Sequence, residues 1–145
     1  MAASPALPLK GRIFISVRDF DKTLVVPVAK GFSDLGFELC ATGGTAQVLQ
    51  ENEIKVQFLF KLTEGRPNVL DMIKNGEVNL IINTPAGQTP RADEVLIRAA
   101  AVAHKIPIMT TLAGANAALL GIQAYREKGL SVCSLQEYHT ALRGG

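Results

Sequence analysis

The sequence predicts an α/β fold, with a single doubly wound, mainly parallel sheet flanked by helices. Short runs rich in β-branched and aromatic residues alternate along the chain with longer segments whose apolar residues recur at helical spacing. This alternation is typical of strands joined by helices that pack on the sheet. The chain has 145 residues, of which 48% are hydrophobic and 19% charged, so it is long enough to bury one core.

The predicted strands follow the apolar runs of the sequence. The first run is RIFISV, and the most apolar is VNLIIN. We expect the latter in the middle of the sheet, because strands there are buried on both faces. The full set of predicted strands is 12–17, 37–41, 56–60, 78–83, 106–110 and a last short strand at 130–133.

The predicted helices fill the intervals between these strands. Gly36 and Gly76 each follow a helical pattern and suit the left-handed residue that closes a helix, and Asn68 suits an N-cap. Pro27 lies inside the first helical pattern and lacks a backbone donor, so we expect a late start or a kink there. The full set of predicted helices is 22–35, 46–52, 69–75, 92–104, 113–128 and a terminal helix at 135–142.

The composition argues against several classes of partner. The net charge is only +2, with both signs interspersed, so we expect no nucleic-acid partner. No apolar run approaches the roughly 20 residues of a membrane span, and the N-terminus lacks a signal-peptide pattern. Cys40 and Cys133 lie far apart in apolar segments and are interpreted as buried thiols of a reducing compartment. We therefore expect a cytoplasmic protein, or one of an organelle stroma if the source is a plastid.

The strongest local signal is TGGT, residues Thr42, Gly43, Gly44 and Thr45, between the second strand and the second helix. Glycines let the backbone turn sharply, and the N–H groups that begin a helix attract a phosphate. The turn is not a P-loop, because the Gly-Lys-Ser/Thr ending is absent. A structural turn in which Thr45 serves as the helix N-cap explains the same four residues equally well.

Further polar residues follow other strands and should reach the same rim of the sheet. Lys22 and Lys61 follow the first and third strands, and two lysines beside a glycine turn favour an anion site. Asn83 ends the fourth strand, where it could bond a base or sugar edge or simply cap a turn. Thr110 and Arg66 are weaker candidates, since a helix cap or coverage of the rim explains them as well.

No catalytic or metal-binding pattern emerges from the sequence. His104 and His139 stand beside no candidate nucleophile, and Asp19 and Asp21 follow the first strand, where they could cap its helix. The spacing of histidine, cysteine and carboxylate residues fits no metal site. We therefore expect a binding domain that has no catalytic residues and needs neither a metal nor a cofactor.

These residues resemble the methylglyoxal-synthase-like domain family, and in particular the C-terminal regulatory domains of carbamoyl phosphate synthetase large chains. The resemblance implies a regulatory domain at 11–142, a linker remnant at 1–10 and a frayed tail at 143–145. The stretches that carry it run in order along most of the chain: 16–19 with Lys22, 36–38, 41–46, 64–67, 73–76, 81–84, 110–112 and 134–137.

The resemblance implies an allosteric site for a nucleoside monophosphate such as UMP or IMP. Pro85 stands where the family has a further hydroxyl, and Ile108 where it has a tyrosine that contacts the activator ornithine. The implied effector site consists of Lys22, Thr42, Gly43, Gly44, Thr45, Lys61 and Asn83. The secondary candidates are Ser16, Arg66, Thr84 and Thr110.

The resemblance also implies partners for the domain. They are the rest of the synthetase large subunit and its glutamine amidotransferase small subunit, in an enzyme that feeds pyrimidine and arginine synthesis. ATP and a divalent metal would be needed only by the catalytic domains of that enzyme.

Two other functions stay open. One is a phosphate-eliminating lyase of the methylglyoxal synthase type, although Arg66 and Ala86 stand where that enzyme has carboxylates and Arg18 where it has a histidine. The other is a structural module that has lost its ligand. A third relative, the cyclohydrolase domain of the enzyme that forms inosine monophosphate, shares the glycine turn but has a longer segment after the position of Arg66.

Overall fold

The computed structural model describes residues 7–87 and 91–127. It contains one five-stranded parallel sheet with the strand order β3-β2-β1-β4-β5. The strands are β1 Arg12–Ser16, β2 Glu38–Thr42, β3 Gln57–Leu59, β4 Leu80–Asn83 and β5 Ile108–Met109. The helices are α1 Lys22–Asp34, α2 Gly43–Glu51, α3 Val69–Lys74, α4 Ala92–Ala103 and α5 Leu112–Glu127, with a 3₁₀ turn at Asp19–Asp21. The predicted fold class is confirmed.

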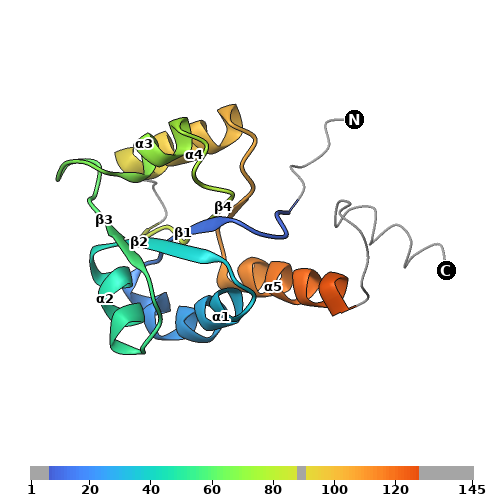
Figure 1. The fold of residues 1–145 in the computed structure, drawn as a ribbon. Helices are drawn as coiled ribbons and strands as arrows, with labels where there is room; N and C mark the ends of the chain where they lie inside the picture. The colour runs from blue at the N-terminus through green and yellow to red at the C-terminus, as the bar shows by residue number, and fades with distance from the viewer. Residues whose placement is uncertain (1–6, 88–90, 128–145) are drawn as a thin grey trace.

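The helices cover both faces of the sheet. Figure 1 shows α3 and α4 on one face and α1, α2 and α5 on the other. Side chains alternate across the sheet: Ile13 and Ile15 point to the core under α1 and α5, whereas Phe14 between them joins the core under α3 and α4. The three-layer arrangement therefore has two buried cores separated by a sheet that is apolar on both sides.

The order of the strands determines where a ligand can enter. The chain first builds outward from β1 to β2 and β3, and then crosses back to place β4 on the other side of β1. In open parallel sheets this reversal leaves a crevice at the carboxyl ends of the two strands concerned. Here those ends are Ser16 of β1 and Asn83 of β4, which are paired in register.

Most of the predicted elements are present, with shifted bounds. The helix predicted at 46–52 begins three residues earlier, at Gly43, and the strand predicted at 106–110 shrinks to Ile108–Met109. The strand predicted in the middle is interior and entirely buried, but β1 occupies the centre. The strand at 130–133, the helix at 135–142 and the tail at 143–145 lie outside the described residues, and the proposed domain boundaries stay predictions.

Helix-terminating residues behave largely as predicted. Gly36 and Gly76 have positive φ angles of 95° and 72° and follow α1 and α3. Asn68 caps α3 through a reciprocal pair of bonds with Asp71. Of the two alternatives expected at Pro27, the late start is wrong, since α1 runs from Lys22 through the proline, and the kink stays a prediction. Within the described residues, no helix is both long and apolar enough to cross a membrane.

Candidate functional site

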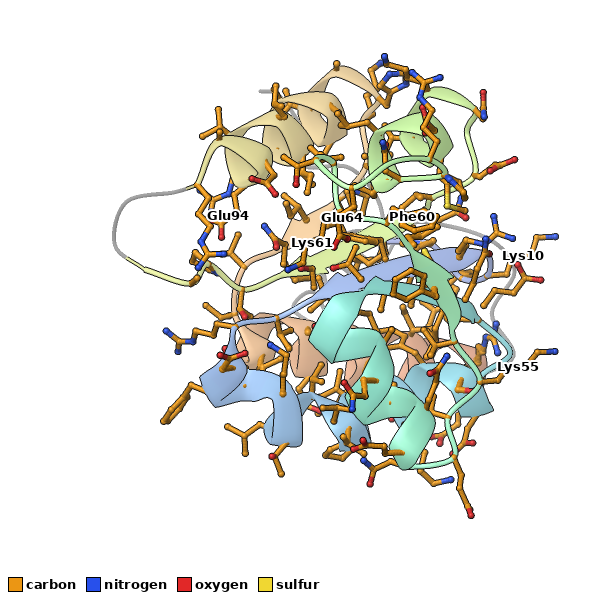
Figure 2. The ribbon with its side chains drawn as sticks, turned by 90° about the vertical axis from the view of Figure 1, so that its left-hand side faces the viewer. Lys10, Lys55, Phe60, Lys61, Glu64 and Glu94 are labelled. Carbon is orange, nitrogen blue, oxygen red and sulfur yellow. The ribbon has the colours of Figure 1, made fainter. Side chains whose placement is uncertain are left out.

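A cavity of about 820 Å³ opens at the carboxyl ends of the strands. It lies at the reversal in strand order, between the layer of α3 and α4 and the N-terminus of α2. Figure 2 shows Lys61 and Glu94 toward this end of the sheet, and Lys10 and Lys55 toward the opposite end. The predicted site residues that line the cavity are Ser16, Lys22, Thr42, Gly44, Thr45, Lys61, Asn83 and Thr84.

The glycine turn places the start of α2 at the cavity. Thr42 is the N-cap in an extended conformation, and its side chain makes no capping bond. Gly43 has a φ of 42°, in the left-handed region that favours glycine. The interpretation of Thr45 as N-cap is wrong: this buried hydroxyl instead accepts the Val17 N–H at 3.2 Å and ties α2 to the end of β1. The first N–H groups of α2 therefore face the cavity without a side-chain cap.

The two lysines lie against the two glycines. A Cβ on Gly44 would stand 2.7 Å from Cε of Lys22, and one on Gly43 would stand 3.4 Å from Cε of Lys61. The turn therefore needs small residues for close approach of the lysines as well as for its backbone angle. The sequence prediction that Lys22 and Lys61 converge on the glycine turn is confirmed in geometry.

The two lysines differ in their partners. The Lys22 ammonium donates to the Val17 carbonyl at 3.2 Å and to Asp19 Oδ1 at 2.5 Å. These contacts with Lys22 hold the pKa of the exposed Asp19 carboxyl below its ordinary value. In the part of the chain that the structure describes, Lys61 forms no ion pair, and only its backbone N–H is held, by Glu64 at 2.9 Å. The Lys22 ammonium is thus fixed and partly neutralised by Asp19, whereas the Lys61 ammonium is available to bind an anion.

Asn83 is the most informative polar residue of the site. It is only 3% exposed, and its Nδ2 atom has no hydrogen-bond partner among the described residues. A buried amide donor without a partner costs about 1–3 kcal/mol. Because Asn83 lines the cavity, a ligand that accepts from this amide would recover that cost.

Several neighbours stabilise the loops around the cavity. Thr84 accepts the Arg18 N–H at 2.9 Å, which joins the loop after β4 to the loop after β1. The Arg18 guanidinium pairs with the buried Asp21 carboxylate at 2.8 Å. Of the two residues suggested as caps of α1, Asp21 occupies the N-cap position, but its side chain makes no capping bond and pairs with Arg18 instead. Asp19 belongs to the 3₁₀ turn and pairs with Lys22.

Glu94 was missed by sequence reasoning. This buried carboxylate accepts the N–H groups of Ala86 and Arg91, each at 3.3 Å, and so holds both ends of the loop before α4. Glu94 stands three residues after the N-cap Arg91 and accepts its backbone N–H, as in a capping box, but the Ser, Thr, Asp or Asn that marks such a box in a sequence is absent. Phe60, Leu62, Val69 and Ile97 form an apolar part of the lining and were also missed, since only their tertiary placement reveals it.

Two secondary candidates are not part of the cavity. The Arg66 side chain is 82% exposed and lies 3.6 Å from Asp71, so it does not line the cavity. Thr110 is exposed beyond β5, and its neighbour Thr111 accepts the Gly114 N–H at 3.0 Å at the start of α5. The cap interpretation of this threonine pair is therefore confirmed for Thr111. Within residues 7–87 and 91–127, no cluster of three or more histidine, cysteine or acidic residues could hold a metal.

The comparison with protein families decides the classification. The model of the MGS-like domain matches residues 24–110. The chain belongs to the MGS-like domain family. The resemblance inferred from the sequence is thus confirmed. The matched range begins inside α1, two residues after Lys22, and includes the glycine turn, Lys61, Asn83 and β5.

The relatives of this MGS-like domain are much longer proteins. It is 48% identical over 138 residues to the carbamoyl phosphate synthase large chain of Nostoc sp., covering 95% of this chain and 12% of that protein. It is 46% identical over 140 residues to the C-terminal section of that large chain in Methanopyrus kandleri, covering 96% and 26%. The chain therefore spans between about an eighth and a quarter of the relatives it matches.

Solved structures support the same fold. Methylglyoxal synthase from Elizabethkingia anophelis aligns with a TM-score of 0.65 at 18% identity, covering 79% of this chain and 80% of that one. Such low identity speaks for the fold alone, and the function must be argued from the cavity.

Proposed function

We propose that this domain binds a nucleoside monophosphate and so regulates a carbamoyl phosphate synthetase large chain of which it is a part. The observation that carries the proposal is the combination of two convergent lysines, an uncapped helix start and the unpartnered Asn83 amide in one cavity. The domain itself would carry out no catalysis, whereas the parent enzyme would use ATP and a divalent metal elsewhere in its chain.

The phosphate would dock over Gly43 and Gly44, between Lys22 and Lys61. The N–H groups at the start of α2 point toward this position, and a helix N-terminus stabilises a negative charge. The hydroxyl of Thr42, which caps nothing, is a further donor. Thr45 acts indirectly, because its hydroxyl holds the turn against Val17.

The nucleoside would occupy the remainder of the cavity. A volume of about 820 Å³ exceeds what a phosphate needs and falls within the range of small-ligand sites. Asn83 Nδ2 is placed to donate to a sugar or base oxygen, and Phe60 and Ile97 supply apolar surface. Pro85 cannot supply a hydroxyl to the ligand, so UMP and IMP must be distinguished by measurement.

Regulation requires that the effector bind two states of the parent enzyme unequally. The domain would transmit that difference to the rest of the large subunit and, through it, to the glutamine amidotransferase small subunit. Under this proposal the protein would work in the cytoplasm, or in a plastid stroma. There it would regulate the enzyme that supplies carbamoyl phosphate for pyrimidines and arginine.

The decisive experiment is a calorimetric titration of the chain with UMP, IMP, uridine and inosine. We expect saturable binding of at least one monophosphate and binding of its nucleoside weaker by at least tenfold, because charge-assisted hydrogen bonds contribute about 1.5–3 kcal/mol each. Equal affinity for nucleoside and monophosphate, or no binding of either, would refute the proposal. Release of methylglyoxal from dihydroxyacetone phosphate, measured alongside, would instead support the lyase.

A further inference from the structure

The ammonium group of Lys22 is already occupied in the structure. It donates to the Val17 carbonyl at 3.2 Å and to Asp19 Oδ1 at 2.5 Å. An ammonium group has three donors, so one is left for a ligand. The Lys22 side chain is 21% exposed and that of Asp19 is 99% exposed, which places the carboxylate on the solvent side of the lysine.

Asp19 differs from an ordinary surface ion pair in its surroundings. Isolated exposed pairs contribute little to stability, but this carboxylate lines the same cavity as Lys22 and Lys61. Its pKa is lowered first by the hydrogen bond and charge of Lys22, and further by the charges of Arg91 and Lys61. The field of three cations therefore acts on Asp19 when no ligand is bound.

The other carboxylates of the cavity are engaged differently. Glu94 accepts the N–H groups of Ala86 and Arg91. Asp21, which does not itself line the cavity, pairs with the lining residue Arg18. Asp93 also lines the cavity but forms no ion pair in the described part of the chain. Asp19 is thus the carboxylate bound to the lysine that lies against Gly44.

We propose that Asp19 competes with the ligand phosphate for Lys22. When a dianion docks over Gly44, Lys22 must release its bond to Asp19 or share itself between the two anions. This inference rests on the proposed phosphate position. A phosphate oxygen on Lys22 Nζ would lie within a few ångströms of the Asp19 carboxylate, and like charges at that distance repel. The repulsion lowers affinity for any phosphate, so inorganic phosphate alone binds weakly while a nucleotide gains further contacts in the cavity.

The competition can be separated from a role of Asp19 in positioning Lys22. Asp19→Asn removes the charge but keeps an oxygen that accepts from Lys22, whereas Asp19→Ala removes both. Asp34→Asn is the matched control, because Asp34 also pairs with a lysine of α1, Lys30, at 3.9 Å, but does not line the cavity. Both positions, Asp19 and Asp34, are exposed, so the three variants should fold.

The test is titration of wild type and variants with inorganic phosphate and with UMP at low and high salt. We expect Asp19→Asn to tighten phosphate binding by about threefold to tenfold at low salt, since unit charges about 4 Å apart in water interact by an energy equivalent to about a fivefold change in affinity. The gain should shrink at high salt, where exposed charges are screened. Asp34→Asn should change neither affinity.

Each outcome decides the inference. Unchanged or weaker phosphate binding by Asp19→Asn overturns it, and a loss only in Asp19→Ala would assign Asp19 to positioning. If UMP binds well but Asp19→Asn gives no gain, the nucleotide function stands without the competitor. If Asp19→Asn tightens phosphate but UMP binds no better than phosphate, the competitor stands and the nucleotide function fails. If no protein in the series binds phosphate or UMP, both the competitor role of Asp19 and the nucleotide function are overturned.

Discussion

The two ends of the parallel sheet use their polar side chains in opposite ways. At the amino end, Arg12 pairs with Glu38 at 2.7 Å and with Glu77 at 4.0 Å, and Asn79 accepts the Arg12 N–H at 2.9 Å. At the carboxyl end, the Asn83 amide is buried without a partner and Lys61 forms no ion pair in the described residues.

This difference indicates what each end does. Polar groups that satisfy one another contribute to stability, whereas buried groups without partners reduce it and are retained where a ligand needs them. Changes at the amino end should therefore affect stability and not binding, whereas changes at Lys61 or Asn83 of the carboxyl end should affect binding without loss of stability.

The largest effect is expected for the lysines of the carboxyl end. Lys22→Ala or Lys61→Ala should weaken binding of UMP or IMP by about tenfold to a hundredfold, because each removes a charge-assisted bond of about 1.5–3 kcal/mol. Titration calorimetry measures the loss. Lys30→Ala, on the outer part of α1 with its side chain 68% exposed, is the control and should bind like wild type. Equal affinities in all four proteins would place the phosphate elsewhere.

A more discriminating change is Asn83→Leu, which keeps the branched shape of the side chain, with bulkier methyl groups, and removes the unpartnered amide. Nucleotide affinity should fall by about tenfold, because one hydrogen bond is lost. The free energy of unfolding should stay equal or rise by about 1 kcal/mol, since a buried unsatisfied donor disappears. Urea denaturation and titration of the same samples give both quantities. If Asn83→Leu loses stability but keeps its nucleotide affinity, Asn83 has a structural role and does not bind the ligand.

The amino end supplies the opposite expectation. Asn79→Ala removes the acceptor of the Arg12 N–H and should lower the free energy of unfolding by about 0.5–1.5 kcal/mol. Nucleotide affinity should not change, because the bond lies at the far end of β1. Chemical denaturation and calorimetry provide the check, and a loss of affinity matching that of Asn83→Leu would mean that the two ends are coupled.

The smallest effect is expected between the two ends, at Cys40 in β2. Burial raises the pKa of this thiol to about 12, from 9.0. The folded state thus binds the proton more tightly than the unfolded state. The contribution of Cys40 to stability is complete below pH 9 and is lost as the pH rises toward 12.

Because the thiolate is the reactive form, alkylation of Cys40 by iodoacetamide at pH 8 should proceed only through opening of the fold. Peptide-resolved mass spectrometry follows Cys40 separately from Cys133. Labelling at the rate of a free thiol would contradict its burial.

Local sequence was sufficient for the parts of this protein that depend on neighbouring residues. Alternating apolar runs specify strands and helices, because each element must bury one face or both. Gly36, Gly43 and Gly76 adopt the backbone angles that only glycine adopts without strain. The rule that ligands gather at the carboxyl ends of parallel strands then brought Lys22, Lys61 and Asn83 to one rim.

The tertiary structure decided what depends on distance between segments. The role of Thr45 was decided by its contact with Val17, which is remote in sequence, and not by its place at the start of α2. Arg66 lies outside the cavity and Glu94 lines it, because the placement of the loop after β3 and of the start of α4 depends on packing between distant segments. Above all, the missing partner of the Asn83 amide is a property of its surroundings. The residue type allows a hydrogen bond, and only the packing around it shows that the amide makes none with residues 7–87 and 91–127.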